Sequence, residues 1–121
     1  EKHYLDDDFD FTGRSIISYT FLDTPYFVNN WSEMYQQVIQ FLFELDSTII
    51  YKLVKQKNGL GYHFTDKETN GFVEIAPKIY LYVATSTQSK IGSLRRIFEI
   101  YGFDGDELGF EIQKSENEDV N

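Results

Sequence analysis

The chain contains no cysteine among its 121 residues, which excludes disulfides, thiolate chemistry and cysteine-ligated metals. Because this composition is compatible with a reducing compartment, we expect a cytoplasmic protein. No apolar run reaches the roughly 18 residues that a membrane span requires, and no signal-peptide pattern is visible. We therefore expect no membrane association. The first residue is Glu1 rather than methionine, which suggests a piece excised from a longer protein.

Histidine is also scarce, with His3 near the start and His63 in a Tyr-His-Phe context. A general base needs a partner and a pocket, and the sequence assigns neither. The spacing of His63, Asp66 and Glu68 matches no established metal-ligand pattern, and the acidic run 6–10 lacks the bend glycine and distal glutamate of a calcium loop. We therefore expect no catalytic residue, no metal and no cofactor. A small enzyme with a pocket around His63 remains a second alternative.

Aromatic residues are abundant, and the acidic residues gather at the two ends. The 11 Phe and 9 Tyr residues can bury large areas, so one domain with its own core is expected at this length. The net charge is −9, yet residues 1–10 hold five acids against Lys2, and residues 114–121 hold three against Lys114. The sequence thus predicts flexible acidic tails over 1–11 and 114–121 around a single domain, 12–113.

The amino-terminal half of that domain predicts a hairpin followed by a helix. Alternating β-forming residues over 15–22, a turn at 23–25 and a short run at 26–28 indicate two antiparallel strands. A broad apolar arc over 31–45, behind an Asn30 cap, indicates a main helix that is buried against a sheet. A short helix is expected over 48–55.

The carboxy-terminal half predicts a central strand and a second main helix. Apolar and tyrosine residues alternate over 78–84, which is typical of a strand covered on both faces. The helix is expected at about 89–101, ended by Gly102, and an edge strand at 109–113. The predicted fold is therefore α+β: a small, mostly antiparallel sheet, formed by the hairpin and strand 78–84, packed against two main helices and a short third.

The start of the second main helix is rich in hydroxyl groups and is followed by basic residues. Helix N-termini present free amides that favour anions, so a phosphate or nucleic-acid contact is predicted there. Ser93 and Arg96 are expected on the exposed helix face, and Arg95 adds a further cation. The alternative is plain helix capping with a solvated basic face. The predicted contact residues are Lys78, Thr85, Ser86, Thr87, Ser89, Lys90, Ser93 and Arg96.

Three segments carry a resemblance to a known family. They are W-S-E-M-Y-Q-Q-V-I-Q-F-L-F-E-L-D at 31–46, K-I-Y-L-Y-V-A-T-S-T-Q-S-K-I at 78–91 and Y-G-F-D-G-D-E-L at 101–108. From about Gly13 to Gln113 the chain resembles a small prokaryotic domain of unknown function. That domain is often appended to the C-terminal end of restriction-type or ParB-like nuclease proteins of phage defence. Where the family has T-N-x-S-A-N-S, this chain has T-S-T-Q-S, and the resemblance transfers no site residue.

Taken with the missing catalytic groups, the resemblance implies a non-catalytic accessory or interaction domain of a prokaryotic protein. Its expected partner is another protein or its own parent chain, and the sequence indicates no oligomeric state. The first alternative is a nucleic-acid-binding module that uses the basic, hydroxyl-rich helix start.

Overall fold

The computed structural model describes residues 1–56 and 59–114. Two long helices form a middle layer, with one sheet on one side of them and a smaller sheet and a short helix on the other. The sequence order of these elements is β1 (Lys2–Tyr4), β2 (Ile16–Phe21), β3 (Thr24–Phe27), α1 (Trp31–Leu45), α2 (Ser47–Lys55), the 3₁₀ helix η1 (Gly59–His63), β4 (Phe64–Thr65), β5 (Phe72–Ala76), β6 (Ile79–Tyr82), α3 (Thr87–Tyr101), the 3₁₀ helix η2 (Gly105–Glu107) and β7 (Leu108–Ile112).

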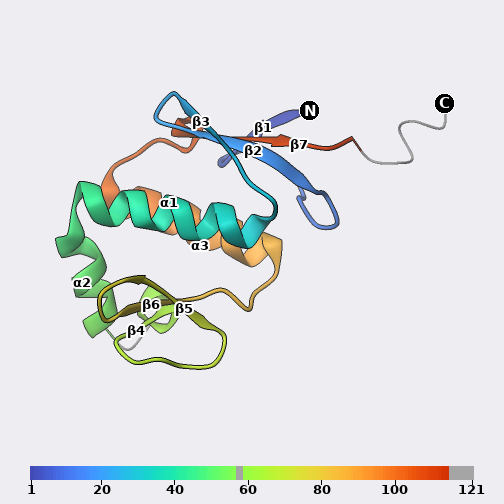
Figure 1. The fold of residues 1–121 in the computed structure, drawn as a ribbon. Helices are drawn as coiled ribbons and strands as arrows, with labels where there is room; N and C mark the ends of the chain where they lie inside the picture. Colours follow the sequence, from blue (N-terminus) through green and yellow to red (C-terminus); the bar gives the residue numbers. More distant parts are fainter. Residues whose placement is uncertain (57–58, 115–121) are drawn as a thin grey trace.

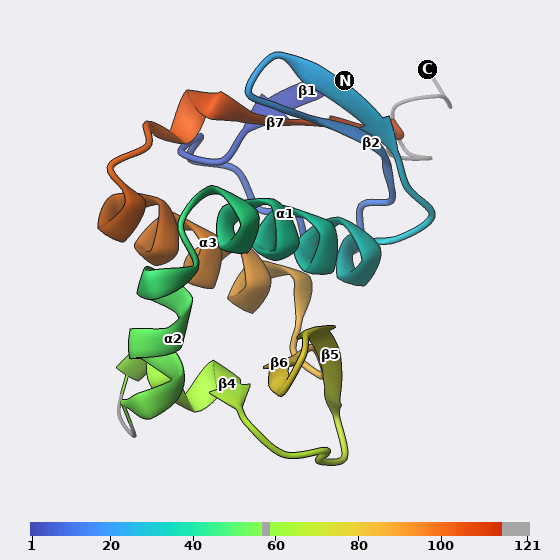
Figure 2. The same cartoon turned by 60° about the vertical axis from the view of Figure 1, so that its left-hand side comes forward.

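The α+β class predicted from the sequence is confirmed, but the strands form two antiparallel sheets instead of one. The first sheet has the order β1-β7-β2-β3 and the second has the order β4-β6-β5. The long helices α1 and α3 lie under the first sheet, and the second sheet lies with α2 on the other side of them (Figures 1 and 2). The hairpin and the strand predicted at 78–84 therefore belong to different sheets, since the helical pair separates them.

The amino-terminal segment is a strand and a packed loop, so the prediction of a flexible tail over 1–11 is wrong. Strand β1 pairs with β7, with His3 opposite Phe110. Leu5 and Phe11 are fully buried in the core. The physical reason is that Leu5 and Phe11 bury their apolar side chains, while Asp6, Asp8 and Asp10 of the same segment remain exposed to solvent. The predicted tail over 114–121 lies, from residue 115 onward, outside the described residues.

This pairing also changes the position of the last strand. Strand β7, predicted as an edge strand at 109–113, lies between β1 and β2. Its inward side chains Leu108, Phe110 and Ile112 are buried. The edges of the first sheet are therefore β1 on one side and β3 on the other.

The two main helices begin and end for the reasons the sequence suggests. The Asn30 side chain accepts from the Glu33 backbone amide at 2.8 Å, and the Glu33 carboxylate accepts in return from the Asn29 amide at 3.3 Å. Helix α3 begins at Thr87, two residues before the predicted start, because Ser86 is its N-cap. It ends at Gly102, which has φ 78°, the left-handed conformation that glycine adopts without strain.

The hairpin turn falls one residue earlier than predicted. Leu22 and Asp23 occupy its two central positions, with φ 49° and 68°, the pattern of a type I′ turn. Pro25 therefore lies inside β3, opposite Thr20 of β2, instead of in the turn. This register decides which backbone groups of β3 face outward.

Candidate functional site

The predicted phosphate site at the start of α3 is used for internal contacts. The Ser86 hydroxyl accepts from the Ser89 backbone amide at 3.1 Å, which is ordinary capping, and it also donates to the Ser89 hydroxyl at 3.0 Å. Thr87 and Thr85 are partly buried. The hydroxyl groups of this turn thus satisfy the helix end itself.

Two of the predicted contact residues, Lys90 and Ser93, are buried, and the expectation that Ser93 lies on the exposed helix face is wrong. Lys90 is only 4% exposed, and its Nζ donates to the Thr85 carbonyl oxygen at 2.6 Å. Burial lowers the pKa of the Lys90 ammonium. Ser93 is 5% exposed and its hydroxyl meets the Tyr35 phenol of α1, whose pKa burial raises to about 12. A small residue at position 93 lets α1 and α3 approach closely.

The remaining predicted cations do not converge on the helix start. Arg96 is exposed, and its Nη2 lies beside Gly59 of η1. Lys78 is exposed in the turn between β5 and β6, with φ 61°. Among the described contacts, no hydrogen bond or ion pair joins either residue to the Thr85–Ser89 turn. The sequence grouped these residues by their proximity along the chain, whereas the fold places Lys78 in the β5–β6 turn and Arg96 farther along α3, beside η1.

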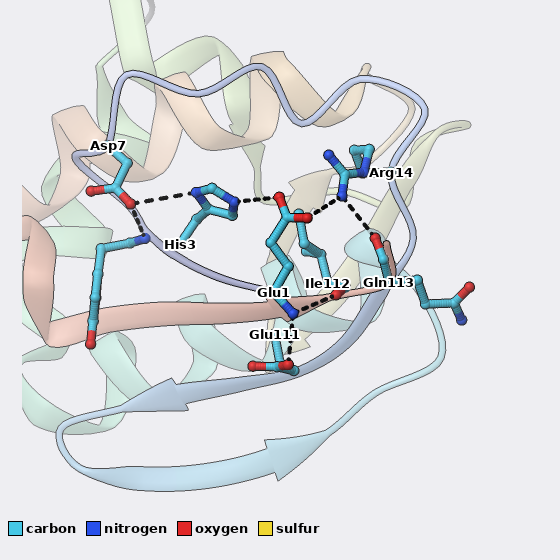
Figure 3. Close-up of polar contacts among 8 residues, drawn as sticks. Glu1, His3, Asp7, Arg14, Glu111, Ile112 and Gln113 are labelled. Carbon is cyan, nitrogen blue, oxygen red and sulfur yellow. Dashed lines mark hydrogen bonds and ion pairs between the residues drawn. The ribbon is translucent and has the colours of Figure 1, made fainter. Parts of the chain in front are cut away.

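A polar cluster at the amino-terminal strand, which the sequence did not predict, is shown in Figure 3. The imidazole Nε2 of His3 lies 2.8 Å from a Glu1 carboxylate oxygen, and its Nδ1 lies 3.7 Å from the Asp7 carboxylate. Arg14 donates to the other Glu1 oxygen and to the Gln113 carbonyl oxygen, both at 2.9 Å. The hydrogen bonds from His3 and Arg14 lower the pKa of Glu1.

Aromatic packing holds this cluster on the core. The His3 ring stacks on Phe9 at 3.7 Å between ring centres, and Phe9 meets the buried Phe11 edge-on at 4.9 Å. The Arg14 guanidinium lies 5.4 Å from the centre of the Phe9 ring. Because its charged groups are paired with one another, the cluster binds the first residues to the sheet and leaves little charge for a ligand.

The region around His63 has little of what acid–base chemistry requires. Burial, followed by the nearby Arg96 guanidinium, lowers the pKa of the His63 imidazole. A hollow of about 640 Å³ beside it is lined by Tyr62, Phe64 and Thr65, but not by His63 itself. Nowhere in residues 1–56 and 59–114 do three or more His, Asp or Glu side chains gather as a metal ion would require.

The outer margin of β3 is the feature of the structure best suited to contact another molecule. Phe27 projects from the solvent face of the sheet and is 83% exposed. On the other face, a groove of about 270 Å³ runs between the hairpin and the last turns of α1. We call this margin, with Phe27 on one face and the groove on the other, the β3 edge. The groove is lined by Phe21, Leu22, Thr24, Tyr26, Phe41, Glu44 and Leu45.

The walls of the groove are rigid aromatic side chains. Tyr26 of β3 packs on Phe41 of α1 with 5.0 Å between ring centres, and Phe41 stacks on Phe21 at 5.9 Å. Tyr26 also stacks on Tyr19, whose hydroxyl donates to Gln37 at 2.6 Å. Leu45, at the end of α1, is 55% exposed. The groove is therefore formed before any partner arrives, which lowers the entropy cost of binding.

The alternation of side chains in the sequence could have predicted the β3 edge. Alternation along 24–27 places Tyr26 and Phe27 on opposite faces, and only one face of a half-covered sheet reaches the core. Phe27 must therefore be exposed if Tyr26 is packed. The prediction of a returning strand at 26–28 left the exposure of these side chains open.

Comparisons of the chain with protein-family models, with curated proteins and with solved structures gave no match. Within the part of the chain that the structure describes, no helix combines the length and apolar character needed to cross a bilayer.

Proposed function

We propose that this protein is a non-catalytic interaction domain and that it binds a protein partner at the β3 edge. The observation that carries the proposal is a preformed groove beside the exposed Leu45, at a sheet margin whose opposite face exposes Phe27. A single exposed apolar side chain is ordinary, but large apolar side chains gathered around one groove are typical of binding sites. Aromatic anchors such as Phe27 often supply most of the binding energy of an interface.

The partner is either a separate protein or another part of a longer parent chain. The resemblance to accessory domains of prokaryotic defence proteins supports this choice, and the proposal includes a prokaryotic origin. It also includes a cytoplasmic location, with which the cysteine-free sequence is compatible. Fractionation of the native cells with an antibody against the domain would test the location.

The nucleic-acid alternative has less support, because the cations that it requires are engaged or dispersed. Lys90 donates to Thr85, and Arg95 donates to backbone carbonyl oxygens of the amino-terminal segment. A titration with a DNA duplex across a salt series separates the two functions. We expect no binding that weakens steeply with salt; a steep slope would favour the alternative, since phosphate contacts release counterions.

Photocrosslinking in the native cells tests the interaction function. A benzophenone amino acid replaces Phe27, and in a control protein it replaces Tyr62, which is 67% exposed in η1. We expect a discrete crosslinked protein from position 27 that is absent from position 62. If both positions capture the same proteins in the same amounts, or neither captures any, the proposed function is contradicted.

A further inference from the structure

We infer that the β3 edge binds an extended peptide segment by antiparallel strand addition, which adds a fifth strand to the first sheet. The inference rests on the proposed function and specifies how the partner is recognised. It is drawn from the backbone groups that β3 turns outward, from the groove beneath them and from the charge of its lining.

The hairpin register decides which groups of β3 are available. Val28 donates its backbone N–H to the Ile17 carbonyl oxygen at 3.2 Å, and Tyr26 lies opposite Tyr19. Hydrogen-bonded and non-hydrogen-bonded pairs alternate along an antiparallel ladder, so residues 24, 26 and 28 bond inward to β2. Phe27 and Pro25 therefore turn their backbone groups outward, away from β2.

These outward groups define a short and asymmetric template. Phe27 offers one N–H and one carbonyl oxygen, which an incoming residue can satisfy as a hydrogen-bonded pair. Pro25 offers a carbonyl oxygen but has no N–H, so it accepts one further bond and donates none. A proline on an edge strand limits uncontrolled pairing, and it leaves room here for a segment that pairs mainly with Phe27.

The other sheet edges are less suited to strand addition. Strand β1 carries Lys2, β5 contains Glu74 and is interrupted by an irregularity between Glu74 and Ala76, and β4 has only two residues. Charges, bulges and short length are the features by which proteins block their sheet edges. Strand β3, Thr-Pro-Tyr-Phe, contains no charged side chain.

The groove indicates the side chains of the incoming segment. In an added antiparallel strand, the residues opposite Tyr26 and Thr24 point into the groove, whereas the residue opposite Phe27 points outward. The inward position next to Tyr26 faces the aromatic wall formed with Phe41, which favours an apolar side chain. Glu44 is the only charged lining residue and makes no ion pair among the described contacts, which favours a lysine or arginine nearby.

Charge makes a second copy of this chain the less suitable occupant. The chain carries a net charge of −9, and the β3 edge itself has Glu44 in the groove and Asp23 in the hairpin turn. Like charges brought together suppress a pairing, whereas a basic segment is attracted to the same surface. The proposed ligand is thus an extended segment with alternating apolar residues and at least one basic residue.

Selection from a random peptide library displayed on phage tests the inference with a defined probe. We expect enriched peptides with apolar residues at alternate positions and a basic residue, and a synthetic copy of the best one should shift the NMR signals of Phe27, Phe41 and Leu45. Failure to enrich any sequence, or shifts confined to another surface, would overturn strand addition.

A pair of substitutions separates the backbone contact from the side-chain contact. Phe27→Ala removes the ring and keeps the N–H, whereas Phe27→Pro removes both. The outward N–H is not needed by the hairpin, so we expect both variants to fold, as their amide spectra would verify. The proline variant should bind the peptide about tenfold more weakly than the alanine variant, the loss expected for one hydrogen bond. Equal affinities would contradict strand addition.

A change in the peptide gives the same information without altering the protein. N-methylation of the peptide residue that pairs with Phe27 should abolish binding, while methylation one residue away, where the amide faces solvent, should be tolerated. If neither methylation weakens binding, the backbone does not take part. A crosslink at position 27 that persists in that case would leave the interaction function intact and remove only the strand-addition mode.

Discussion

Arg95 of α3 donates from its Nε to the carbonyl oxygen of Leu5 at 2.7 Å, across 90 residues of sequence. Its Nη2 donates to the Asp7 carbonyl oxygen at 2.8 Å. These two bonds hold the loop after β1 against the helix, beside a hollow of about 360 Å³ that Leu5 and Arg95 help to line. Arg95, which was counted among the cations of the nucleic-acid alternative, thus holds the segment after the first strand in place.

Replacing Arg95 with alanine should destabilise the domain. The variant leaves two backbone carbonyl oxygens without their charged donor, and hydrogen bonds to charged groups contribute more than neutral ones. We expect a loss of about 1–3 kcal/mol in the free energy of unfolding, measured by urea denaturation followed by the fluorescence of Trp31.

Arg96→Ala is the matched control for that substitution, since the neighbouring arginine is exposed. Its effect should stay within about 0.5 kcal/mol, as for most surface substitutions. Equal losses in the two variants would show that Arg95 has no special structural role.

Substitution by alanine should have opposite effects on the stability of the domain at two glycines. A Cβ at Gly61 would overlap the Gln56 carbonyl group and lie 2.8 Å from the Leu53 carbonyl oxygen, both of which are backbone atoms that cannot move aside cheaply. At Gly92, inside α3, a Cβ meets nothing within 4 Å. We expect Gly61→Ala to destabilise by about 2 kcal/mol or more and Gly92→Ala to stabilise by about 0.5–1 kcal/mol. Thermal unfolding would reveal either sign, and a stabilised Gly61→Ala would contradict the close packing of η1 on α2.

The His63 imidazole should titrate below its ordinary pKa of 6.5, because burial and the Arg96 guanidinium disfavour its protonated form. The unfolded chain then binds more protons than the folded one just below pH 6.5, so this residue makes the domain less stable as pH falls through that range. NMR titration of the ring should show the low pKa, and Arg96→Gln should raise it. An Arg96→Gln variant with unchanged His63 pKa would rule out the Arg96 contribution.

The sequence was sufficient for the helices, because their signals are local. The Asn30 cap, the apolar arc of α1 and the Gly102 stop each act within a few residues. Local signals could not predict how the strands divide between two sheets, because that division depends on which faces of α1 and α3 each strand covers. The first strand was missed because five acids in residues 1–10 dominated a composition argument, and because its pairing with β7 joins the two ends of the chain.

The candidate site was predicted less well than the fold, for a related reason. Lys90, Ser93 and Arg96 follow one another three residues apart on α3, but their surroundings differ. Lys90 donates to the Thr85 carbonyl oxygen, Ser93 packs on Tyr35 and Arg96 is exposed. The β3 edge depends on the absence of a neighbour on one side of β3, which is a property of the whole sheet and not of the residues 24–27.

Amide hydrogen exchange of residues 26–28 tests the account most directly. In the free domain we predict slow exchange for Tyr26 and Val28, whose N–H groups bond to β2, and fast exchange for Phe27, whose N–H faces outward. Addition of the selected peptide should slow the exchange of Phe27 specifically. Slow exchange at Phe27 without peptide, or exchange that the bound peptide leaves unchanged, would contradict the central claim that β3 is an open edge for strand addition.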